Sequence, residues 1–106
     1  MLNVAFRPIE SKDLAYINMV RNSCRHFLHN DKFLELPETI HWFVFEKPEW
    51  YLLTALEMKE DISVAETKIG YIRTKKHGTG LQIGMDLEEH WRGRGYAKQA
   101  YKQFIS

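Results

Sequence analysis

The sequence has little of several residue types that mark specialised classes of protein. It holds one cysteine, Cys24, in 106 residues, so no internal disulfide can form and a disulfide-stapled secreted domain is excluded. No apolar run approaches the roughly 20 residues that a membrane helix needs. Arg7 and Glu10 interrupt the N-terminal stretch too early for the apolar region of a signal peptide. We therefore expect a cytoplasmic protein that does not contact a membrane.

A strong charge of either sign is also missing. Lys and Arg total 15 and Asp and Glu total 14, which leaves a formal net charge of +1 at pH 7. A chain so close to neutrality is not built mainly to hold a polyanion, which argues against a nucleic-acid partner. The remaining composition, 44% hydrophobic and 27% charged, is that of an ordinary globular protein. The length predicts one small domain over residues 1–106.

Hydrophobic periodicity divides the chain into alternating strands and helices. Residues 3–9 alternate between apolar and polar side chains, which is typical of a short strand. Apolar residues then recur every three or four positions from Leu14 to Leu28, which predicts an amphipathic helix. Ser11 stands where the N-cap of this helix belongs, and Asn30 marks its end.

A second helix is expected over residues 37–46, because Pro37 suits the first turn of a helix. Apolar residues within it are spaced so that they lie on one side of the helix. We expect its buried face to consist of Ile40, Phe43 and Val44.

Three strands and a last helix complete the pattern. The strands are expected over residues 50–57, 68–74 and 81–87, and the short polar turns between them make neighbouring strands antiparallel. The helix is expected to begin near Gly95 and to run to the end of the sequence. The order is β-α-α-β-β-β-α. The fold class is therefore α/β of the α+β type, a mostly antiparallel sheet with flanking helices.

The segment that is most informative about chemistry is 87–101 (LEEHWRGRGYAKQAY), in which a strand passes through a basic loop into a helix. Gly93 and Gly95 lack a Cβ atom, so a bulky anion can approach their backbone. Arg92 and Arg94 add positive charge beside the unpaired N–H groups of a helix start. The pattern predicts a binding site that can hold a pyrophosphate without the help of a metal ion. A plain glycine-rich turn with solvated arginines is the alternative.

Residues 92–97 (RGRGYA) resemble the R/Q-x-x-G-x-G/A motif of the GNAT superfamily, the acyl-CoA-dependent N-acyltransferases. The strand before the motif, the helix after it and the order of the upstream elements are also similar, so the resemblance covers essentially the whole chain. The motif sequence is most similar to that of the branch that acetylates protein N-termini and amino sugars. The resemblance implies that acetyl-CoA is the co-substrate and that the acetyl group passes to a primary amine. The acceptor would be an amino sugar, a protein N-terminus or a small amine.

The same resemblance implies which residues hold the coenzyme. Backbone N–H groups of residues 93–97 would bind the pyrophosphate, and Arg92 would start that loop. Main-chain groups of the preceding strand would pair with the pantetheine arm. The residues assigned to the coenzyme in this way are Met85, Asp86, Leu87, Arg92, Gly93, Arg94, Gly95, Tyr96 and Ala97.

The catalytic residues are not identified by the sequence. Gln82 and Asp86 share one face of the strand at 81–87 and are candidates for contacting the acceptor amine, although the polar face of a strand explains them equally. Aromatic residues in and after the second helix form either core or a wall of the acceptor site. These are Trp42, Phe43, Phe45, Trp50 and Tyr51.

No metal site is expected. Cys24, His26 and His29 form a C-x-H-x-x-H string, but these residues do not share one face of a helix, and a metal needs convergent ligands.

The GNAT superfamily normally continues with a strand, a helix and a further strand after the motif helix. We therefore expect this chain to be truncated after its coenzyme-binding helix, which leaves the activity of the 106 residues alone open. The edge of the strand at 81–87 would then be covered by a second copy, as a homo-oligomer, or by a complementing C-terminal segment. A non-catalytic acyl-CoA-binding or protein-interaction module derived from the same fold is the alternative function.

Overall fold

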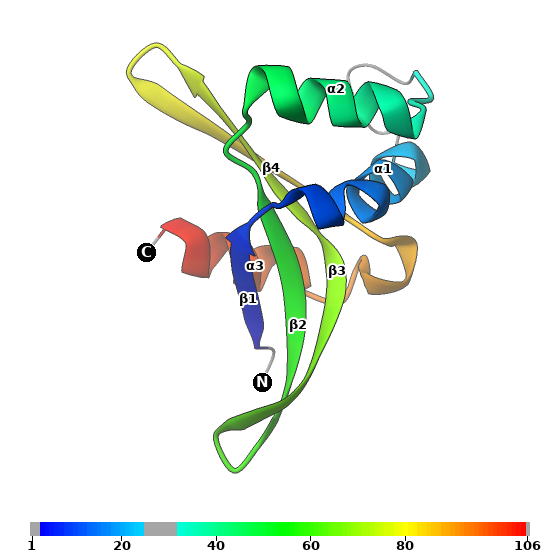
Figure 1. The fold of residues 1–106 in the computed structure, drawn as a ribbon. Coiled ribbons are helices and arrows are strands. Elements are labelled where there is room, and N and C mark those ends of the chain that lie inside the picture. The colour runs from blue at the N-terminus through cyan, green and yellow to red at the C-terminus, as the bar shows by residue number, and fades with distance from the viewer. Residues whose placement is uncertain (1–2, 25–31, 106) are drawn as a thin grey trace.

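The chain forms one antiparallel sheet with helices on both of its faces (Figure 1). A computed structural model describes residues 3–24 and 32–105. The elements are β1 (Val4–Pro8), the 3-10 turn η1 (Ser11–Asp13), α1 (Leu14–Ser23), α2 (Leu36–Glu46), β2 (Tyr51–Lys59), β3 (Ile62–His77), β4 (Gly80–Leu87), the 3-10 turn η3 (Glu89–Trp91) and α3 (Tyr96–Ile105). This order confirms the predicted α/β class.

The strands lie in the order β1-β2-β3-β4, and every neighbouring pair is antiparallel. β3 is much longer than the expected strand at 68–74, because its first half pairs with β2 and its second half with β4. Sequence periodicity missed the first half because residues 62–67 lie in a projecting hairpin arm with both sides exposed (Figure 1). An arm without a buried face has no reason to alternate apolar and polar residues.

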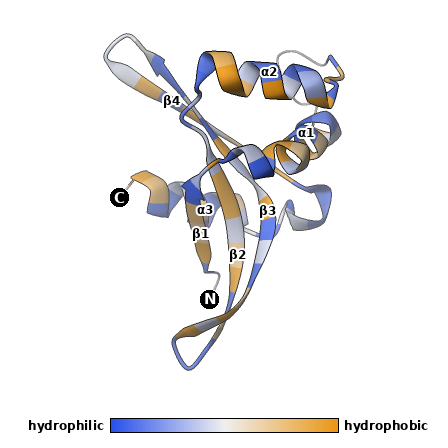
Figure 2. Cartoon of the chain, viewed as in Figure 1, coloured by the Kyte–Doolittle hydropathy of each residue, from blue (hydrophilic) through white to orange (hydrophobic). Residues whose placement is uncertain are grey.

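Apolar side chains on the two faces of the sheet form two separate cores. On the face that α1 and α2 cover, Leu52 and Tyr71 pack against helix residues such as Ile17. On the opposite face, Leu53 packs together with Ala100 of α3. Figure 2 shows the hydrophobic residues along β1 and β2 that supply much of this burial. Neighbouring residues of β2, and likewise of β3, thus belong to different cores.

The first helix starts differently from the sequence expectation. Ser11 is not its N-cap, because it lies inside the turn η1, where Glu10 and Asp13 form a reciprocal capping box. α1 then runs only to Ser23 and is shorter than expected. The predicted apolar stripe is confirmed at four buried positions, which are Leu14, Ile17 and Val20 of α1 and Cys24 directly after it. Phe27, Leu28 and Asn30, with which the expected helix ended, lie outside the described residues.

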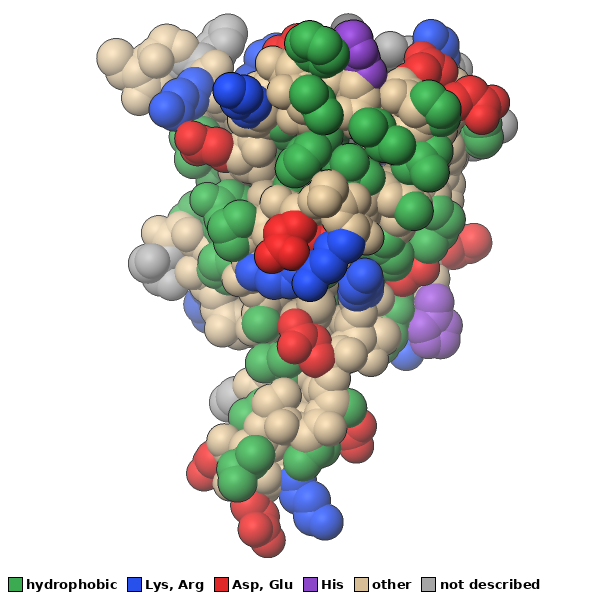
Figure 3. Space-filling view, in the orientation of Figure 1, with side chains coloured by type: hydrophobic (Ala, Val, Ile, Leu, Met, Phe, Trp, Pro, Cys, Tyr) green, Lys and Arg blue, Asp and Glu red, His purple; other side chains and the backbone are tan. Residues whose placement is uncertain are grey.

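Of the three residues predicted for the buried face of α2, only Phe43 packs against the core. Ile40 and Val44 are 44% and 56% exposed, whereas Thr39 is buried. The helix is turned this way because Thr39 Oγ1 donates a hydrogen bond of 2.6 Å to Asn18 Oδ1 of α1, and Trp42 packs on the connection to β2. Figure 3 shows apolar side chains on the surface of the upper part of the molecule, where α2 lies in Figure 1.

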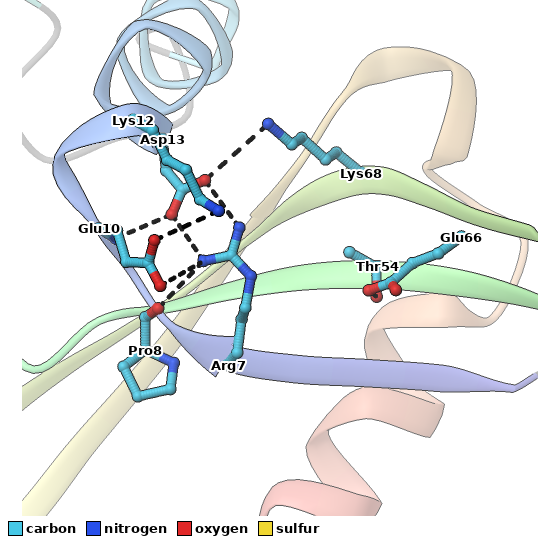
Figure 4. Close-up of polar contacts among 8 residues, drawn as sticks. All are labelled: Arg7, Pro8, Glu10, Lys12, Asp13, Thr54, Glu66 and Lys68. Atoms are coloured by element: carbon cyan, nitrogen blue, oxygen red, sulfur yellow. Dashed lines mark hydrogen bonds and ion pairs between the residues drawn. The ribbon is translucent and has the colours of Figure 1, made fainter.

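A buried carboxylate ties β1 to the start of α1 (Figure 4). Asp13 accepts two hydrogen bonds from the Arg7 guanidinium, at 2.8 and 2.9 Å, and a third from the Glu10 backbone N–H at 2.8 Å. Lys68 Nζ lies 3.9 Å from the same carboxylate. Burial by itself would raise the pKa of Asp13, but the hydrogen bonds from Arg7 and Glu10 outweigh it and hold that pKa below its usual range. The ion pair sets the direction in which the chain leaves the sheet for α1.

Candidate functional site

A loop with two glycines joins the end of the sheet to α3. After η3, the chain passes through Gly93 and Gly95 with φ values of 71° and 87°. These are left-handed conformations that residues with a side chain rarely adopt. A Cβ atom placed on Gly93 would meet nothing within 4 Å, so the space above this backbone is open. An anion can therefore approach the loop closely.

The start of α3 adds unpaired N–H groups to this loop. The first hydrogen bond of the helix runs from the Gln99 N–H to the Gly95 carbonyl, at 3.1 Å. The N–H groups of residues 96–98 precede this bond and have no partner within the helix. The first turn carries no acidic side chain among residues 96–99, and Lys98 is exposed there. Together with the helix dipole, these groups suit a phosphate or a pyrophosphate.

The two arginines of the loop differ in their surroundings. Arg92 Nε donates a hydrogen bond of 2.8 Å to the Leu87 carbonyl, and Arg92 Nη2 lies 3.0 Å from Cys24 Sγ. Arg92 thereby joins the loop to the ends of β4 and α1. Arg94 is exposed to solvent. The first arginine therefore positions the loop, whereas the second is available to a charged ligand.

Two further contacts brace the turn before the loop. The Tyr16 hydroxyl of α1 donates a hydrogen bond of 2.8 Å to Glu88 Oε2. Burial and the neighbouring Glu88 carboxylate raise the pKa of Tyr16, so its hydroxyl stays protonated. The Trp91 ring packs edge-on against Tyr96, with centroids 5.3 Å apart. These contacts hold the residues directly before and directly after the loop in place.

A groove lies beside the loop, between β4 and α3. Its volume is about 550 Å³, and its apolar lining includes Met85 of β4 with Ala97, Tyr101 and Ile105 of α3. β4 is an edge of the four-stranded sheet. The groove therefore adjoins backbone groups that no other strand of the described residues pairs.

A cleft opens between the C-terminal end of α2 and the hairpin of β3 and β4. Its volume is about 600 Å³. Trp42 and Trp50 line it as an aromatic wall, with ring centroids 4.5 Å apart, and Trp50 stacks on Tyr71 at 5.1 Å. Glu46, the last residue of α2, places a carboxylate on the same side.

The sheet side of this cleft carries a guanidinium that is held by a buried carboxylate. Arg73 Nε lies 2.9 Å from Asp86 Oδ2, and Arg73 Nη2 lies 3.4 Å from Oδ1. The Asp86 side chain is 7% exposed, whereas that of Arg73 is 37% exposed and lines the cleft. The guanidinium lies across Gly84, its partner on β4, where an added Cβ would come within 2.7 Å of Nη2. Glycine at this position therefore makes room for the arginine.

Tyr71 is a second buried polar residue beside this pair. It is the cross-strand partner of Asp86 and is fully buried, and its hydroxyl has no hydrogen-bond partner among the described residues. Burial, together with the charge of Asp86, raises the pKa of Tyr71. The hydroxyl therefore stays protonated.

Neither a metal cluster nor a membrane-spanning helix occurs in the part of the chain that the structure describes. Within residues 3–24 and 32–105, no three side chains of His, Cys, Asp or Glu are placed to hold a metal ion. No helix of these residues is long and apolar enough to cross a membrane. His26 and His29 lie outside the described residues.

Comparison with known proteins finds similarity in structure rather than in sequence. No family model matches the chain, and no curated protein matches it. Among solved structures, a domain from Methanocaldococcus jannaschii DSM 2661 matches with a TM-score of 0.77 and 14% identity, over 99% of this chain and 69% of that chain. Ribosomal-protein-alanine N-acetyltransferase from Brucella melitensis matches with a TM-score of 0.65 and 14% identity, over 95% of this chain and 64% of that chain.

A third neighbour is yncA, a proposed acetyltransferase from Salmonella typhimurium, whose structure contains its cofactor acetyl-CoA. The TM-score is 0.65 at 13% identity, over 97% of this chain and 61% of that chain. The chain has a GNAT-like fold. At such low identity the likeness concerns the fold alone, and this chain spans 61 to 69% of the lengths of the three neighbours.

The GNAT-like fold keeps the expected order around the motif, because residues 92–97 follow the edge strand β4 and lead into α3. Of the backbone groups assigned to the pantetheine arm, the Leu87 carbonyl is already engaged by Arg92. Those of Met85 and Asp86 lie on the edge strand. The contacts of these residues with a coenzyme stay a prediction.

The cleft was predicted less completely than the loop. Trp42 and Trp50 line the cleft, but Tyr51 lies on the other face of the sheet, where its ring contacts that of Phe104 at 5.1 Å. Gln82 also lines the cleft, at an exposed position. Three charged lining residues were not anticipated, namely Arg73, Lys75 and Glu46. None of them belongs to a motif. In the sequence, only Gly84 hints at the arginine that lies across it. Gly84 can be connected with Arg73 only when the pairing of β3 with β4 is known.

Proposed function

We propose that this chain binds acetyl-CoA through residues 92–97 and provides the coenzyme-binding part of an N-acetyltransferase for a primary amine. The observation that carries the proposal is the open backbone at Gly93, which continues through the left-handed Gly95 to the N–H groups at the start of α3 that have no partner within the helix. The GNAT-like fold of the chain supports it. The coenzyme supplies an acetyl thioester, whose acetyl group passes to the amine with release of the thiol.

Different residues of the loop contribute to coenzyme binding in different ways. Backbone N–H groups of 93–97 donate to the pyrophosphate, and the exposed Arg94 and Lys98 add charge-assisted contacts. Arg92 keeps the loop in place through the Leu87 carbonyl. The apolar groove beside Met85 takes the pantetheine arm.

The acceptor amine approaches from the cleft on the other side of β4. Both hollows reach this strand, the cleft through Gln82 and Gly84 and the groove through Met85. An amine in the cleft therefore comes close to a thioester that lies along the strand edge. Holding two reactants next to each other is a large part of what acetyl transfer requires.

A titration of acetyl-CoA into the ¹⁵N-labelled chain tests the coenzyme site. We expect amide signals of residues 93–98 to shift together with the indole N–H of Trp91, because Trp91 packs against the start of α3. The indole signals of Trp42 and Trp50, which line the cleft, serve as internal controls and should shift less. Shifts confined to other residues, or none at all, contradict the proposal.

A non-catalytic acyl-CoA-binding module is the second candidate function. It is favoured by the state of the two catalytic candidates from the sequence, because Asp86 is paired with Arg73 and the amide of Gln82 is no base at neutral pH. Thiol release from acetyl-CoA, measured with a panel of primary amines, separates the candidates. Release that depends on the amine supports an enzyme, and binding without release supports the module.

We propose in addition that a further strand covers the edge of β4, from a second copy or from a complementing C-terminal segment. The open edge supports this pairing over residues 80–84 of β4, which leaves the groove beside Met85 to the pantetheine arm. Light scattering over a dilution series tests it. A single monomer mass from micromolar to millimolar protein, with a cooperative melt, contradicts it.

A further inference from the structure

We propose that the acceptor carries an anionic group, a carboxylate or a phosphate, in addition to its amine, and that Arg73 binds this group. The inference rests on the proposed function, because it names the chemistry of the acceptor for the same site. It starts from the guanidinium that lines the cleft while its partner Asp86 is buried behind it.

Arg73 is already paired with Asp86 before any ligand arrives. Its Nε and Nη2 atoms face Asp86 at 2.9 and 3.4 Å, and Nη1 takes no part in this pair. The guanidinium also rests across Gly84, which leaves no space for a different side chain there. A cation that is already ordered loses little conformational freedom when it binds a second anion. Its planar fork suits the two oxygens of a carboxylate or a phosphate.

The remaining charges of the cleft are complementary to an amine with an anionic group. Lys75 lies on the same strand as Arg73 and lines the same side of the cleft, whereas Glu46 lines it from the end of α2. A primary amine is an ammonium ion near neutral pH, which a carboxylate attracts. Two opposite charges on the ligand therefore meet two opposite charges on the protein. An amine without an anionic group leaves Arg73 without a ligand partner.

The aromatic wall of the cleft guides the choice of probes. Trp42 and Trp50 offer ring surface to an acceptor with an apolar or flat body. L-Phenylalanine combines such a body with both charges, phenethylamine lacks the carboxylate and 3-phenylpropionate lacks the amine. Glucosamine 6-phosphate and glucosamine form a second pair, which differs only in the phosphate. The two pairs distinguish a carboxylate from a phosphate as the recognised anion.

The indole signals of the ¹⁵N-labelled chain report where each probe binds. Trp42 and Trp50 line the cleft, whereas Trp91 belongs to the core on the other face of the sheet. We expect at least one of the two anionic amines to shift the cleft signals at a concentration at least tenfold lower than its partner without the anion. Equal affinity within both pairs, or no shift with any of the five compounds, overturns the inference.

Variants then test the role of Arg73. Arg73→Gln removes the cation, and Gly84→Ala displaces it, because the new Cβ meets the movable end of the side chain rather than backbone. Both should abolish the preference for the anionic amine. Lys76→Gln is the matched control, because it removes an exposed cation of the same strand outside the cleft and should keep the preference. If Arg73→Gln does not fold, Gly84→Ala decides. A preference that survives in the folded variants overturns the inference.

The failure of this inference is distinguishable from the failure of the proposed function. Acetyl-CoA added to the same sample is expected to shift Trp91 and the amides of 93–98. If these signals respond while no anionic amine is preferred, the coenzyme site stands and the acceptor chemistry is wrong. If they do not respond to acetyl-CoA, the proposed function itself is wrong.

Discussion

The loop and the cleft are two regions of this molecule that are made in opposite ways. The loop is one continuous segment, 92–97, and the groups that we propose for binding are backbone N–H groups beside two left-handed glycines. The cleft is assembled from side chains of α2, β3 and β4, and its key charge is positioned by a buried ion pair. A substitution therefore damages the loop by adding atoms, and it damages the cleft by removing a partner. Both regions depend on β4, which places Asp86 in one and Leu87 beside the other.

The largest effect is expected where the two regions join. Gly70 of β3 faces the end of β4, and a Cβ there would lie 2.1 Å from the Asp86 carbonyl oxygen and 2.9 Å from the Leu87 Cα. Backbone cannot yield as a flexible side chain does, so Gly70→Ala should lower the free energy of unfolding by about 3 kcal/mol or more. Denaturant unfolding measures this. Gly84→Ala, whose Cβ meets only a side chain, is the control and should cost much less.

Asp13 belongs to neither region but holds the helix that both contact. Asp13→Ala should lower the free energy of unfolding by about 2 kcal/mol, because the Arg7 guanidinium and the Glu10 N–H lose their buried partner. The folded-state pKa of Asp13 is lowered, so its stabilisation is present above about pH 4 and is lost as the pH falls through the folded pKa.

Melting temperatures recorded from about pH 7 to about pH 2 test this linkage. The parent should lose stability at the acid end more steeply than Asp13→Ala. Parallel acid profiles for the two proteins would show that this carboxylate is not a major source of the pH dependence. Lys12→Ala, which removes an exposed charge of the same turn, should leave the profile unchanged.

Substitution of one arginine of the loop should mainly lower the stability of the fold, whereas substitution of the other should mainly weaken the binding of acetyl-CoA. Arg92→Ala removes the hydrogen bond to the Leu87 carbonyl and the contact with Cys24, which should cost about 1–2 kcal/mol of stability. Arg94→Ala should leave stability within about 0.5 kcal/mol and weaken acetyl-CoA binding, most clearly at low salt. Denaturation and calorimetry of both variants test the contrast. Equal stability losses contradict the assignment of Arg92 as the positioning residue.

The smallest effect is expected at the brace between α1 and the turn before the loop. Tyr16→Phe removes a hydrogen bond of 2.8 Å to Glu88 and should cost about 1 kcal/mol of stability. Tyr101→Phe, at an exposed tyrosine of α3, is the control and should change nothing measurable in denaturant unfolding. If both variants unfold like the parent, the brace does not contribute.

The loop could be predicted from the sequence because its chemistry is local. Two glycines between a strand and a helix favour left-handed backbone in the loop, and both adopt this conformation. The element order was predictable for the same reason, since apolar periodicity and turn residues act over short distances. Pro37 in the first turn of α2 is an example.

The cleft could not be predicted in the same way because it depends on pairings across the sheet. Arg73 contacts Asp86, 13 residues away, only because β3 and β4 pair in one register. The prediction of the buried face of α2 was wrong at two positions for a related reason. Ile40 and Val44 are as apolar as a buried stripe requires, but the hydrogen bond of Thr39 to α1 turns them outward. Long-range contacts of this kind leave no periodic trace in the chain.

The central claim is that open backbone at 93–97 binds the coenzyme, and one calorimetric comparison tests it most directly. Acetyl-CoA is titrated into the parent, into Gly95→Asp and into Gly78→Asp. Both glycines have positive φ, and Gly78 lies in the remote hairpin turn, so the two variants carry the same change under similar backbone strain. We expect Gly95→Asp to lose at least tenfold in affinity, about 1.4 kcal/mol, while Gly78→Asp stays within about twofold of the parent. A parent that does not bind, or a Gly95→Asp chain that binds as tightly as the parent, contradicts the claim.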